Sequence, residues 1–429
     1  MMNYQEMSAD ELRALRDQLQ KEYDGFKAMD LSLDMTRGKP CSEQLDLTNG
    51  IFEGIEKTGF KTSSGQDVRN YGIPKGIDDA RKLFAEILDT SYENIFIGNT
   101  SSLNMMFDAI TRAVIWGEHD SEKPWGQIPN KKWLCPAPGY DRHFRVTEKM
   151  GFELIPVPMT SEGPDMDVVE ELVKDPSVLG IWCVPVYSNP DGIVYSENVC
   201  KRLASMKTAA KDFRIFWDNA YVVHHLYDDE SKQGRVPDIL GLCEKAGNPS
   251  RVYEFASTSK VTFAGGGISA LAANKENFDH ADKIMFVQAI CANKVNQLAH
   301  VNFLPDMEAV KKQMSKHAEI LRPKFELALD LMDKAFDGTG IVRYQRPLGG
   351  YFISLFVFPG TAAKVVSLCK EAGVALTPAG ATYPYGKDPD DSNIRIAPSF
   401  PSLDDISKAI PVLCVCAKMT AIDKILEAK

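Results

Sequence analysis

The chain has 429 residues, of which 44% are hydrophobic and 25% are charged, and its formal net charge is -10. This length is too great for one ordinary hydrophobic core, so we expect a globular protein with two packed lobes. The acidic charge argues against a nucleic-acid-binding protein, because neutralising phosphates requires a basic surface.

The first 50 residues predict a surface helix followed by an extended arm. Ser8 and Glu11 have the spacing of a capping box, and the polar pattern after them predicts an exposed helix over residues 8–28. Residues 31–50 contain glycine and proline, which favour an extended segment. The N-terminus lacks the apolar core of a signal peptide, and no stretch approaches the roughly 20 apolar residues of a membrane helix. We therefore expect a cytoplasmic protein.

Strand-like and helix-like segments alternate through the middle of the chain. Short apolar runs predict strands at residues 94–98, 132–136, 153–159, 179–187, 213–221, 251–257 and 267–274. Amphipathic segments between several of these runs predict helices. Alternation of this kind predicts an α/β fold, with a mainly parallel sheet covered by helices on both faces.

The pattern changes near residue 306. A long helical segment over residues 307–336 predicts a connection into a second lobe, which ends in a helix over residues 402–428. We expect three regions: an N-terminal helix and arm at 1–50, a large domain at 51–305 and a small C-terminal domain at 306–429. The helix and arm are expected to form part of the small domain.

Polar residues follow the predicted strands at the edge where an open parallel sheet binds its ligands. Asn189 follows one strand, Asp218 and Tyr221 end the next, and Ser257 and Lys260 follow a third. Each has an ordinary explanation when taken alone, as a turn residue, a helix cap, a core tyrosine or a surface charge. Together they supply an amide, a carboxylate, a phenol, a hydroxyl and an amine at one edge of the sheet.

A fourth strand turns into a helix through Asn99, Thr100 and Ser101. Free backbone N–H groups and hydroxyls at a helix N-terminus form an anion site. Pyridoxal 5'-phosphate (PLP) uses all of these groups: an amine for its aldehyde, a carboxylate for its pyridine nitrogen and an anion site for its phosphate. The sequence therefore predicts PLP as the cofactor, and no cluster of metal ligands is visible.

The ordered set of motifs resembles the fold-type I PLP enzymes, specifically the class I/II aminotransferases. It is most similar to the divergent branch called type Id aspartate aminotransferases or MocR-like aminotransferases, from "TRGKP" at residue 36 to "IRIAPS" at residue 394. The resemblance implies a mainly parallel seven-stranded sheet between helices in a large PLP-binding domain. It also implies a smaller α+β domain, built from the C-terminus and the N-terminal segment.

The resemblance implies roles for the residues around the cofactor ring. Lys260 matches the Schiff-base lysine, which also moves the proton between the substrate and the cofactor. Asp218 matches the partner of the pyridine nitrogen, and Tyr221 and Asn189 match the ligands of the ring oxygen. Tyr140, in "APGYDRHF", matches the aromatic residue that stacks on the ring.

The phosphate end is implied in the same way. Asn99, Thr100 and Ser101 match the phosphate-binding turn, and Ser257 matches the hydroxyl three residues before the lysine. Tyr71, in "NYGIPKG", matches a tyrosine that reaches the phosphate of the partner subunit, which implies a homodimer with shared active sites. One departure is that "VTFAGGGIS", after Lys260, lacks the arginine that many relatives place at the phosphate.

The substrate end is less completely specified. Arg395, in "NIRIAPS", matches the arginine that binds the substrate α-carboxylate through a bidentate pair. Gly38 matches the glycine that lets substrate approach the backbone, and Asn189 also faces the substrate. A dicarboxylic substrate needs a second cation, for which Arg37 is the first candidate, with an exposed loop charge as its alternative. Weaker candidates are Lys39, Arg142, Arg343 and Arg346.

The reaction implied is transfer of an amino group from an amino acid to a 2-oxo acid by a ping-pong mechanism. The resemblance favours L-aspartate and 2-oxoglutarate. Alternatives are an aminotransferase for alanine, an aromatic amino acid or 2-aminoadipate, and a PLP-dependent C–S β-lyase.

Two other classes fit less well. A MocR-type regulator would need a DNA-binding domain, and only about 30 residues precede "LDMTRGKP". A nucleotide enzyme would need a glycine-rich phosphate motif, which is missing. His224 and His225 are adjacent, so their side chains diverge, and we expect them to be structural.

Overall fold

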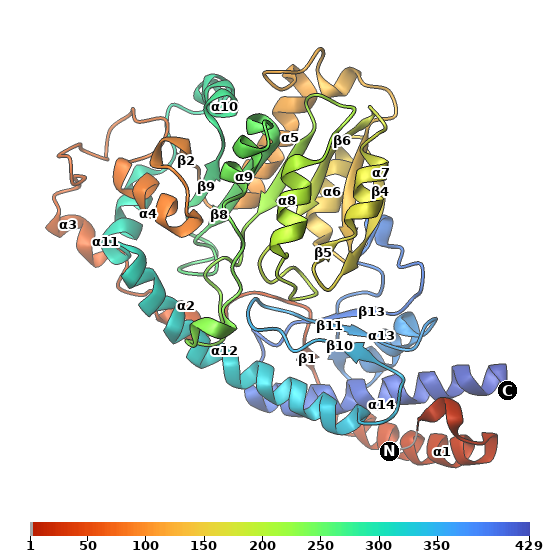
Figure 1. The fold of residues 1–429 in the computed structure, drawn as a ribbon. Coiled ribbons are helices and arrows are strands. Elements are labelled where there is room, and N and C mark those ends of the chain that lie inside the picture. The colour runs from red at the N-terminus through yellow and green to blue at the C-terminus, as the bar shows by residue number, and fades with distance from the viewer. Residues whose placement is uncertain (1–2) are drawn as a thin grey trace.

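The computed structural model describes residues 3–429, and its centre is a twisted sheet (Figure 1). Within these residues the sheet has eight strands in the order β2-β9-β8-β7-β6-β3-β4-β5. The strands are β2 (Ile95–Ile97), β3 (Lys132–Ala137), β4 (Glu153–Thr160), β5 (Gly163–Pro164), β6 (Val178–Cys183), β7 (Arg214–Asp218), β8 (Val252–Ser257) and β9 (Ser269–Ala272). Strands β8, β7, β6, β3 and β4 run parallel, whereas β9 is antiparallel to both of its neighbours. The mainly parallel sheet is therefore confirmed, and the two-residue β5 adds an edge strand to the seven expected.

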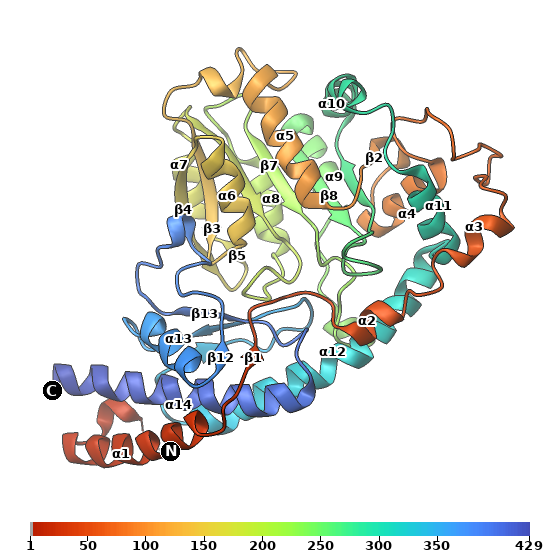
Figure 2. The ribbon, with the colours of Figure 1, turned by 180° about the vertical axis from the view of Figure 1, so that it is seen from behind.

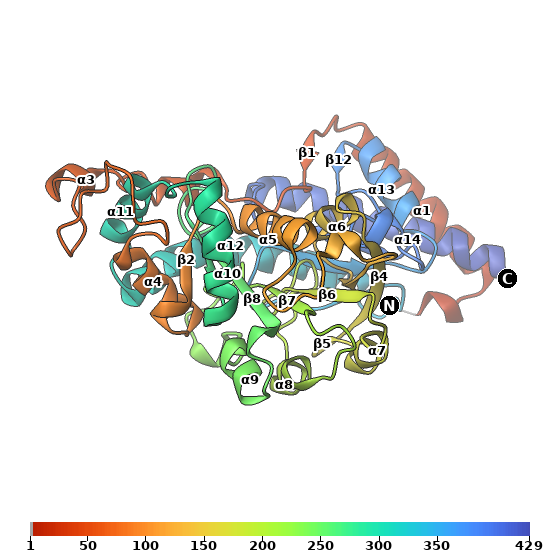
Figure 3. The ribbon, with the colours of Figure 1, turned by 90° about the horizontal axis from the view of Figure 1, so that it is seen from above.

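Helices cover both faces of this sheet because its central strands are apolar on both sides. Every residue of β6 and β7 is buried. Helices α5 (Ser102–Trp116) and α6 (Asp141–Lys149) lie on one face (Figures 2 and 3). Helices α7 (Met166–Leu172), α8 (Glu197–Ser205) and α9 (Ile239–Lys245) lie on the other. The polar residues that follow the strands are thereby left at the one open edge.

A second core forms around α12 (Met307–Phe336) and α14 (Leu403–Ala428), which pack together along the bottom of Figure 1. An antiparallel sheet in the order β10-β11-β13 lies on them. Its strands and the neighbouring elements are β10 (Arg343–Tyr344), β11 (Ile353–Phe356), α13 (Ala362–Glu371), β12 (Val374–Ala375) and β13 (Asn393–Ile396). Strand β1 (Leu33–Asp34), from the N-terminal arm, pairs with β12. The division at residues 50 and 305 stays a prediction.

The other helices include α2 (Ser42–Asp46), α3 (Glu53–Lys57), α4 (Asp78–Leu88), α10 (Lys275–Gln288) and α11 (Lys294–Phe303). Of these, α4 and α10 pack against the core around the central sheet. Among residues 3–429, no helix is both long and apolar enough to cross a membrane.

The N-terminal helix α1 (Ala9–Lys27) begins at the capping box that the sequence predicts. Ser8 accepts a hydrogen bond from the backbone N–H of Glu11, whose side chain accepts from the N–H of Ser8. The helix is exposed at most of its positions, as expected, but Leu12 and Tyr23 are buried because α1 packs along α14 (Figure 1). A narrow apolar stripe, spaced at helical intervals in a polar segment, is enough to dock the helix.

Replacing Leu12 by alanine should loosen this contact. Leu12 is fully buried, so the loss of its side chain should lower the free energy of unfolding by about 2–5 kcal/mol. The neighbouring Arg13 is exposed, so Arg13→Ala serves as the matched control. Urea unfolding followed by circular dichroism measures both variants, and equal midpoints would contradict the packing of Leu12 between α1 and its neighbours.

Candidate functional site

A cavity of about 270 Å³ lies at the carboxyl ends of the parallel strands. It brings together eight of the residues that the sequence singles out: Gly38, Ser101, Tyr140, Asn189, Asp218, Tyr221, Ser257 and Lys260. Five of them end or follow strands β6, β7 and β8, which are adjacent and parallel, so the carboxyl ends of these strands meet at one edge. The strand order thus explains why residues far apart in the chain share one cavity.

Lys260 follows β8 and places its amine inside the cavity. Its Nζ lies 4.9 Å from the centre of the Tyr221 ring. Burial lowers the pKa of Lys260, although the carboxylate of Asp218 acts in the opposite direction. A lowered pKa increases the fraction of neutral amine, which is the nucleophilic form of lysine. Burial also raises the pKa of Tyr221, so its phenol stays protonated and can donate a hydrogen bond.

Asp218 ends β7 and has one paired and one unpaired oxygen. His143 Nε2 lies 2.9 Å from Asp218 Oδ2, and both side chains are buried. Asp218 Oδ1 is buried without a hydrogen-bond partner among the described residues. Leaving a buried carboxylate oxygen unpaired costs free energy, so this atom fits a donor from a bound ligand. The protonated nitrogen of a pyridine ring is such a donor, and the site therefore fits PLP.

His143 is a site residue that no sequence motif indicated. It lies on the inner face of α6, three residues after Tyr140, and its ring stacks on Trp182 with centroids 4.4 Å apart. Its position in the sequence could have indicated this role, because it lies one helical turn after Tyr140, on the face of the helix that packs against the sheet.

The predicted phosphate turn lies at the N-terminus of α5 and is fixed by hydroxyl groups. Ser101 caps the helix by accepting a hydrogen bond from the N–H of Asn104 at 3.4 Å. Ser259 donates to the carbonyl of Thr100 at 3.2 Å, and Ser257 donates to Ser259 at 3.1 Å. Helix N–H groups and hydroxyls can hold an anion here without an arginine.

Among the described residues that line the cavity, Lys260 is the only cationic one. The backbone approaches closely at Gly267, where an added Cβ would lie 3.1 Å from the nitrogen of Ser259. Asn99 and Thr100 do not line the cavity. The Oδ1 atom of Asn99 instead accepts a hydrogen bond from the N–H of Asn293, just before α11.

Arg395, on β13, reaches the site from the second core. Its Nη1 lies 3.2 Å from Asp141 Oδ1 and 3.4 Å from Asn189 Oδ1. Its guanidinium lies 5.0 Å from the centre of the Phe352 ring, and its buried Nε has no partner among the described residues. The guanidinium is thus held at the cavity's edge with donor capacity to spare, as binding a carboxylate requires.

Gly38 lines the cavity from the N-terminal arm and touches Phe352. A Cβ added at Gly38 would lie only 2.0 Å from the end of the Phe352 ring. A ring atom at this distance must move before any side chain fits. The position therefore accepts glycine alone unless Phe352 moves.

Two predicted residues lie outside the cavity. Tyr71 is 78% exposed, and the two flanking carbonyls, of Asn70 and Gly72, accept hydrogen bonds from buried Lys294 Nζ at 2.6 Å each. Arg37 is exposed and pairs with Asp34 at 3.3 Å. Neither reaches the site within one chain.

The weaker cation candidates and the histidine pair also lie apart from the cavity. Lys39 lies over Phe400, Arg343 lies over Phe356, Arg346 pairs with Asp330 and Asp333, and Arg142 is exposed. Burial lowers the pKa of His224, which packs between Tyr221 and Tyr351, and His225 Nδ1 lies 2.6 Å from the Tyr187 hydroxyl.

Residues 7–429 match the family model described as aspartate amino-transferase. The chain belongs to this family. An aspartate aminotransferase from Corynebacterium glutamicum is 46% identical, and the match covers 98% of this chain and 96% of that protein. A putative aminotransferase from Mycolicibacterium smegmatis is 47% identical over the full length of both chains.

Solved structures agree with this assignment. An aspartate transaminase from C. glutamicum superposes with a TM-score of 0.97, at 46% identity and with 99% of each chain covered. An α-aminoadipate aminotransferase from Thermus thermophilus, solved with N-(5'-phosphopyridoxyl)-L-leucine, has a TM-score of 0.72 at 20% identity and shares the fold. The expected aminotransferase activity and fold-type I architecture are therefore confirmed.

Replacing Gly38 by alanine should impair catalysis without unfolding the enzyme. The added methyl group would displace the Phe352 ring, on which the Arg395 guanidinium lies, and a misplacement of about 1 Å can lower kcat/KM by about 100-fold. Gly25→Ala, on α1, is the control, because an added Cβ there meets nothing within 4 Å. Steady-state kinetics with circular dichroism measures both, and a wild-type kcat/KM in Gly38→Ala would contradict the close contact.

Proposed function

We propose that this aminotransferase transfers the amino group of L-aspartate to 2-oxoglutarate and uses PLP as its cofactor. The observation that carries the proposal is that one cavity contains both the Lys260 amine and an Asp218 oxygen that has no hydrogen-bond partner among the described residues. The choice of L-aspartate is supported by the relative that is 46% identical over nearly the full length and is named aspartate aminotransferase.

Lys260 would hold the PLP aldehyde, Asp218 its pyridine nitrogen, and Tyr221 and Asn189 its ring oxygen. Tyr140 would stack on the ring. The phosphate would lie at the N-terminus of α5, with Asn99, Thr100, Ser101 and Ser257 around it. When bound, PLP supplies an electron sink that stabilises negative charge on the substrate Cα.

The protein's own residues supply binding and proton transfer. The neutral amine of Lys260 would take the proton from the substrate Cα and later return a proton, a task favoured by the lowered pKa of this lysine. Arg395 binds the α-carboxylate through its planar fork, and Asn189 keeps that fork in place. Fixing the substrate in this way removes orientational freedom before the reaction.

The side-chain carboxylate of L-aspartate needs a second cation, and we assign it to Arg37. This residue directly precedes Gly38, which lines the cavity. Arg37 forms an exposed ion pair with Asp34 at 3.3 Å. An exposed ion pair contributes about 0–1 kcal/mol to stability, so Arg37 can exchange Asp34 for a substrate carboxylate at little cost in free energy.

The proposal includes a cytoplasmic homodimer with two shared active sites. Exposed Tyr71 lies on a loop held by Lys294 and does not line its own cavity, and a residue that serves a partner subunit needs such exposure. We also propose the division into residues 1–50 and 306–429, as the small domain, and 51–305, as the large PLP-binding domain.

An absorbance spectrum before and after adding L-aspartate, without any oxo acid, tests the proposal. We expect a visible band from bound PLP that shifts to shorter wavelength while one equivalent of oxaloacetate appears. If L-aspartate leaves the band unchanged, the proposed substrate is wrong. The same spectra would then be recorded with 2-aminoadipate, alanine and aromatic amino acids. Pyruvate and ammonia formed without an acceptor would indicate a β-lyase, and no band after adding PLP would contradict the cofactor.

Replacing Arg37 by glutamine tests the specificity assignment. We expect kcat/KM for L-aspartate to fall about 10- to 100-fold, because one charge-assisted hydrogen bond is lost, while kcat/KM for L-alanine stays the same. Arg346→Gln is the matched control, because Arg346 pairs with Asp330 away from the cavity. An equal loss for both substrates, or no loss, would contradict the role of Arg37.

A further inference from the structure

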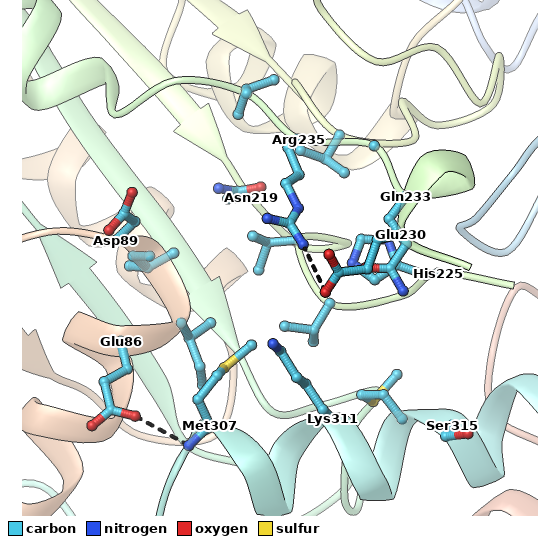
Figure 4. Close-up of a pocket in the computed structure, with 18 of the residues that line it drawn as sticks. Glu86, Asp89, Asn219, His225, Glu230, Gln233, Arg235, Met307, Lys311 and Ser315 are labelled. Atoms are coloured by element: carbon cyan, nitrogen blue, oxygen red, sulfur yellow. Dashed lines mark hydrogen bonds and ion pairs between the residues drawn. The ribbon is translucent and has the colours of Figure 1, made fainter. Parts of the chain in front are cut away.

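A second cavity, of about 870 Å³, lies between the end of α4, the loop after β7 and the start of α12 (Figure 4). Its inner wall includes Glu254 of β8. Glu254 pairs in register with Trp217, so its side chain points to the opposite face of the sheet from Asp218. The cavity is therefore separate from the site that contains Lys260.

The inner end of this cavity is acidic and lacks a cation. Glu254 is 3% exposed, and burial, together with nearby Asp238 and Asp89, raises the pKa of Glu254 to about 8. Among the described residues, no lysine or arginine forms an ion pair with any of these three carboxylates. The carboxylates of Asp238 and of exposed Asp89 therefore disfavour the ionised form of Glu254 unless a cation joins them.

Two buried oxygen atoms at the inner end lack donors. Asn219 is 4% exposed and donates through Nδ2 to Glu254 Oε1 at 3.0 Å, but its Oδ1 has no partner among the described residues. Asp238 Oδ1 is also buried and unpartnered. Both residues line the cavity. Unpaired acceptors cost free energy, so the site is suited to a ligand that donates hydrogen bonds.

The rest of the cavity is apolar inside and charged at its mouth. Figure 4 shows the side chains of Asn219, Asp89, Arg235 and Lys311 around an open space. Lys311 and Arg235 are exposed, and Arg235 pairs with Glu230 at 3.7 Å. Apolar side chains form much of the wall: Leu88, Val186, Val222, Val223, Val236 and Met314.

We propose that this cavity binds an organic ammonium ion with an apolar body. Its N–H groups would donate to Asn219 Oδ1 and to the carboxylates of Asp238 and Glu254, and its hydrocarbon part would lie against the valines. A bare metal ion fits less well, because no group of three histidine, cysteine or acidic residues among residues 3–429 is arranged to hold one. A dicarboxylic amino acid is disfavoured by the same acidic inner end.

Calorimetric titration of the PLP-loaded enzyme with N,N-dimethylhexylamine tests this inference. A tertiary amine cannot condense with the PLP aldehyde, and its ammonium form still donates one hydrogen bond. We expect binding that persists in saturating succinate, a dicarboxylate aimed at the substrate site, with 1-hexanol at least about tenfold weaker because it lacks the charge. Absent binding, equal binding of 1-hexanol or loss of binding in succinate would overturn the inference.

Binding to variants of the lining residues, and proton release on binding, test where in the cavity the amine is bound. Glu254→Gln should weaken binding about tenfold or more, whereas Glu308→Gln, at an exposed lining position, should change it little. Asp238→Asn should also weaken binding.

The pKa of Glu254, about 8, leaves its carboxyl group mostly protonated at pH 7, and a bound cation lowers this pKa. Binding of the amine to the wild-type enzyme should therefore release a proton. Titrations in buffers of different ionisation enthalpy detect this release. Unchanged affinity in the folded variants, or no proton release by wild type, would overturn the inference.

Discussion

A buried carboxylate at the end of β7 is the constraint on which the site depends. Asp218 is taken out of water, and only one of its oxygens has a partner, the imidazole of His143. Such a group is costly to bury unless its remaining oxygen is also paired. The stacking of His143 on Trp182 holds the contact from the α6 side of the sheet. The second oxygen is left for a ligand, and the amine of Lys260 lies in the same cavity.

The site is completed by segments from the second core and the N-terminal arm. Arg395 on β13 contacts Asn189 across 206 positions of sequence, and its guanidinium lies over Phe352, next to Gly38. Arm strand β1 pairs with β12, which ties the arm to the same core. A shift of this core against the central sheet would therefore move the Arg395 guanidinium relative to Lys260.

The elements with strong periodicity could be predicted from the sequence, and so could the polar residues at the strand ends. Contacts that depend on tertiary packing could not. His143 meets Asp218 only because α6 packs on the sheet, and Asp141 meets Arg395 across 254 positions. The docking of α1 was also missed, because its few apolar positions are outnumbered by polar ones. Asn99 lies in the predicted turn, but its side chain faces α11. The types of residue at the strand ends were enough to predict the chemistry of the site. The directions in which their side chains point could be determined only from the structure.

Lys260 shares its cavity with Asp218, and we assign PLP to this lysine. Borohydride reduction of the PLP-loaded enzyme, followed by mass spectrometry of its peptides, tests the assignment. We expect one phosphopyridoxyl group per chain, on the peptide that contains Lys260, and none in Lys260→Ala. A phosphopyridoxyl group on another lysine of the wild-type enzyme, or none at all, would overturn the assignment.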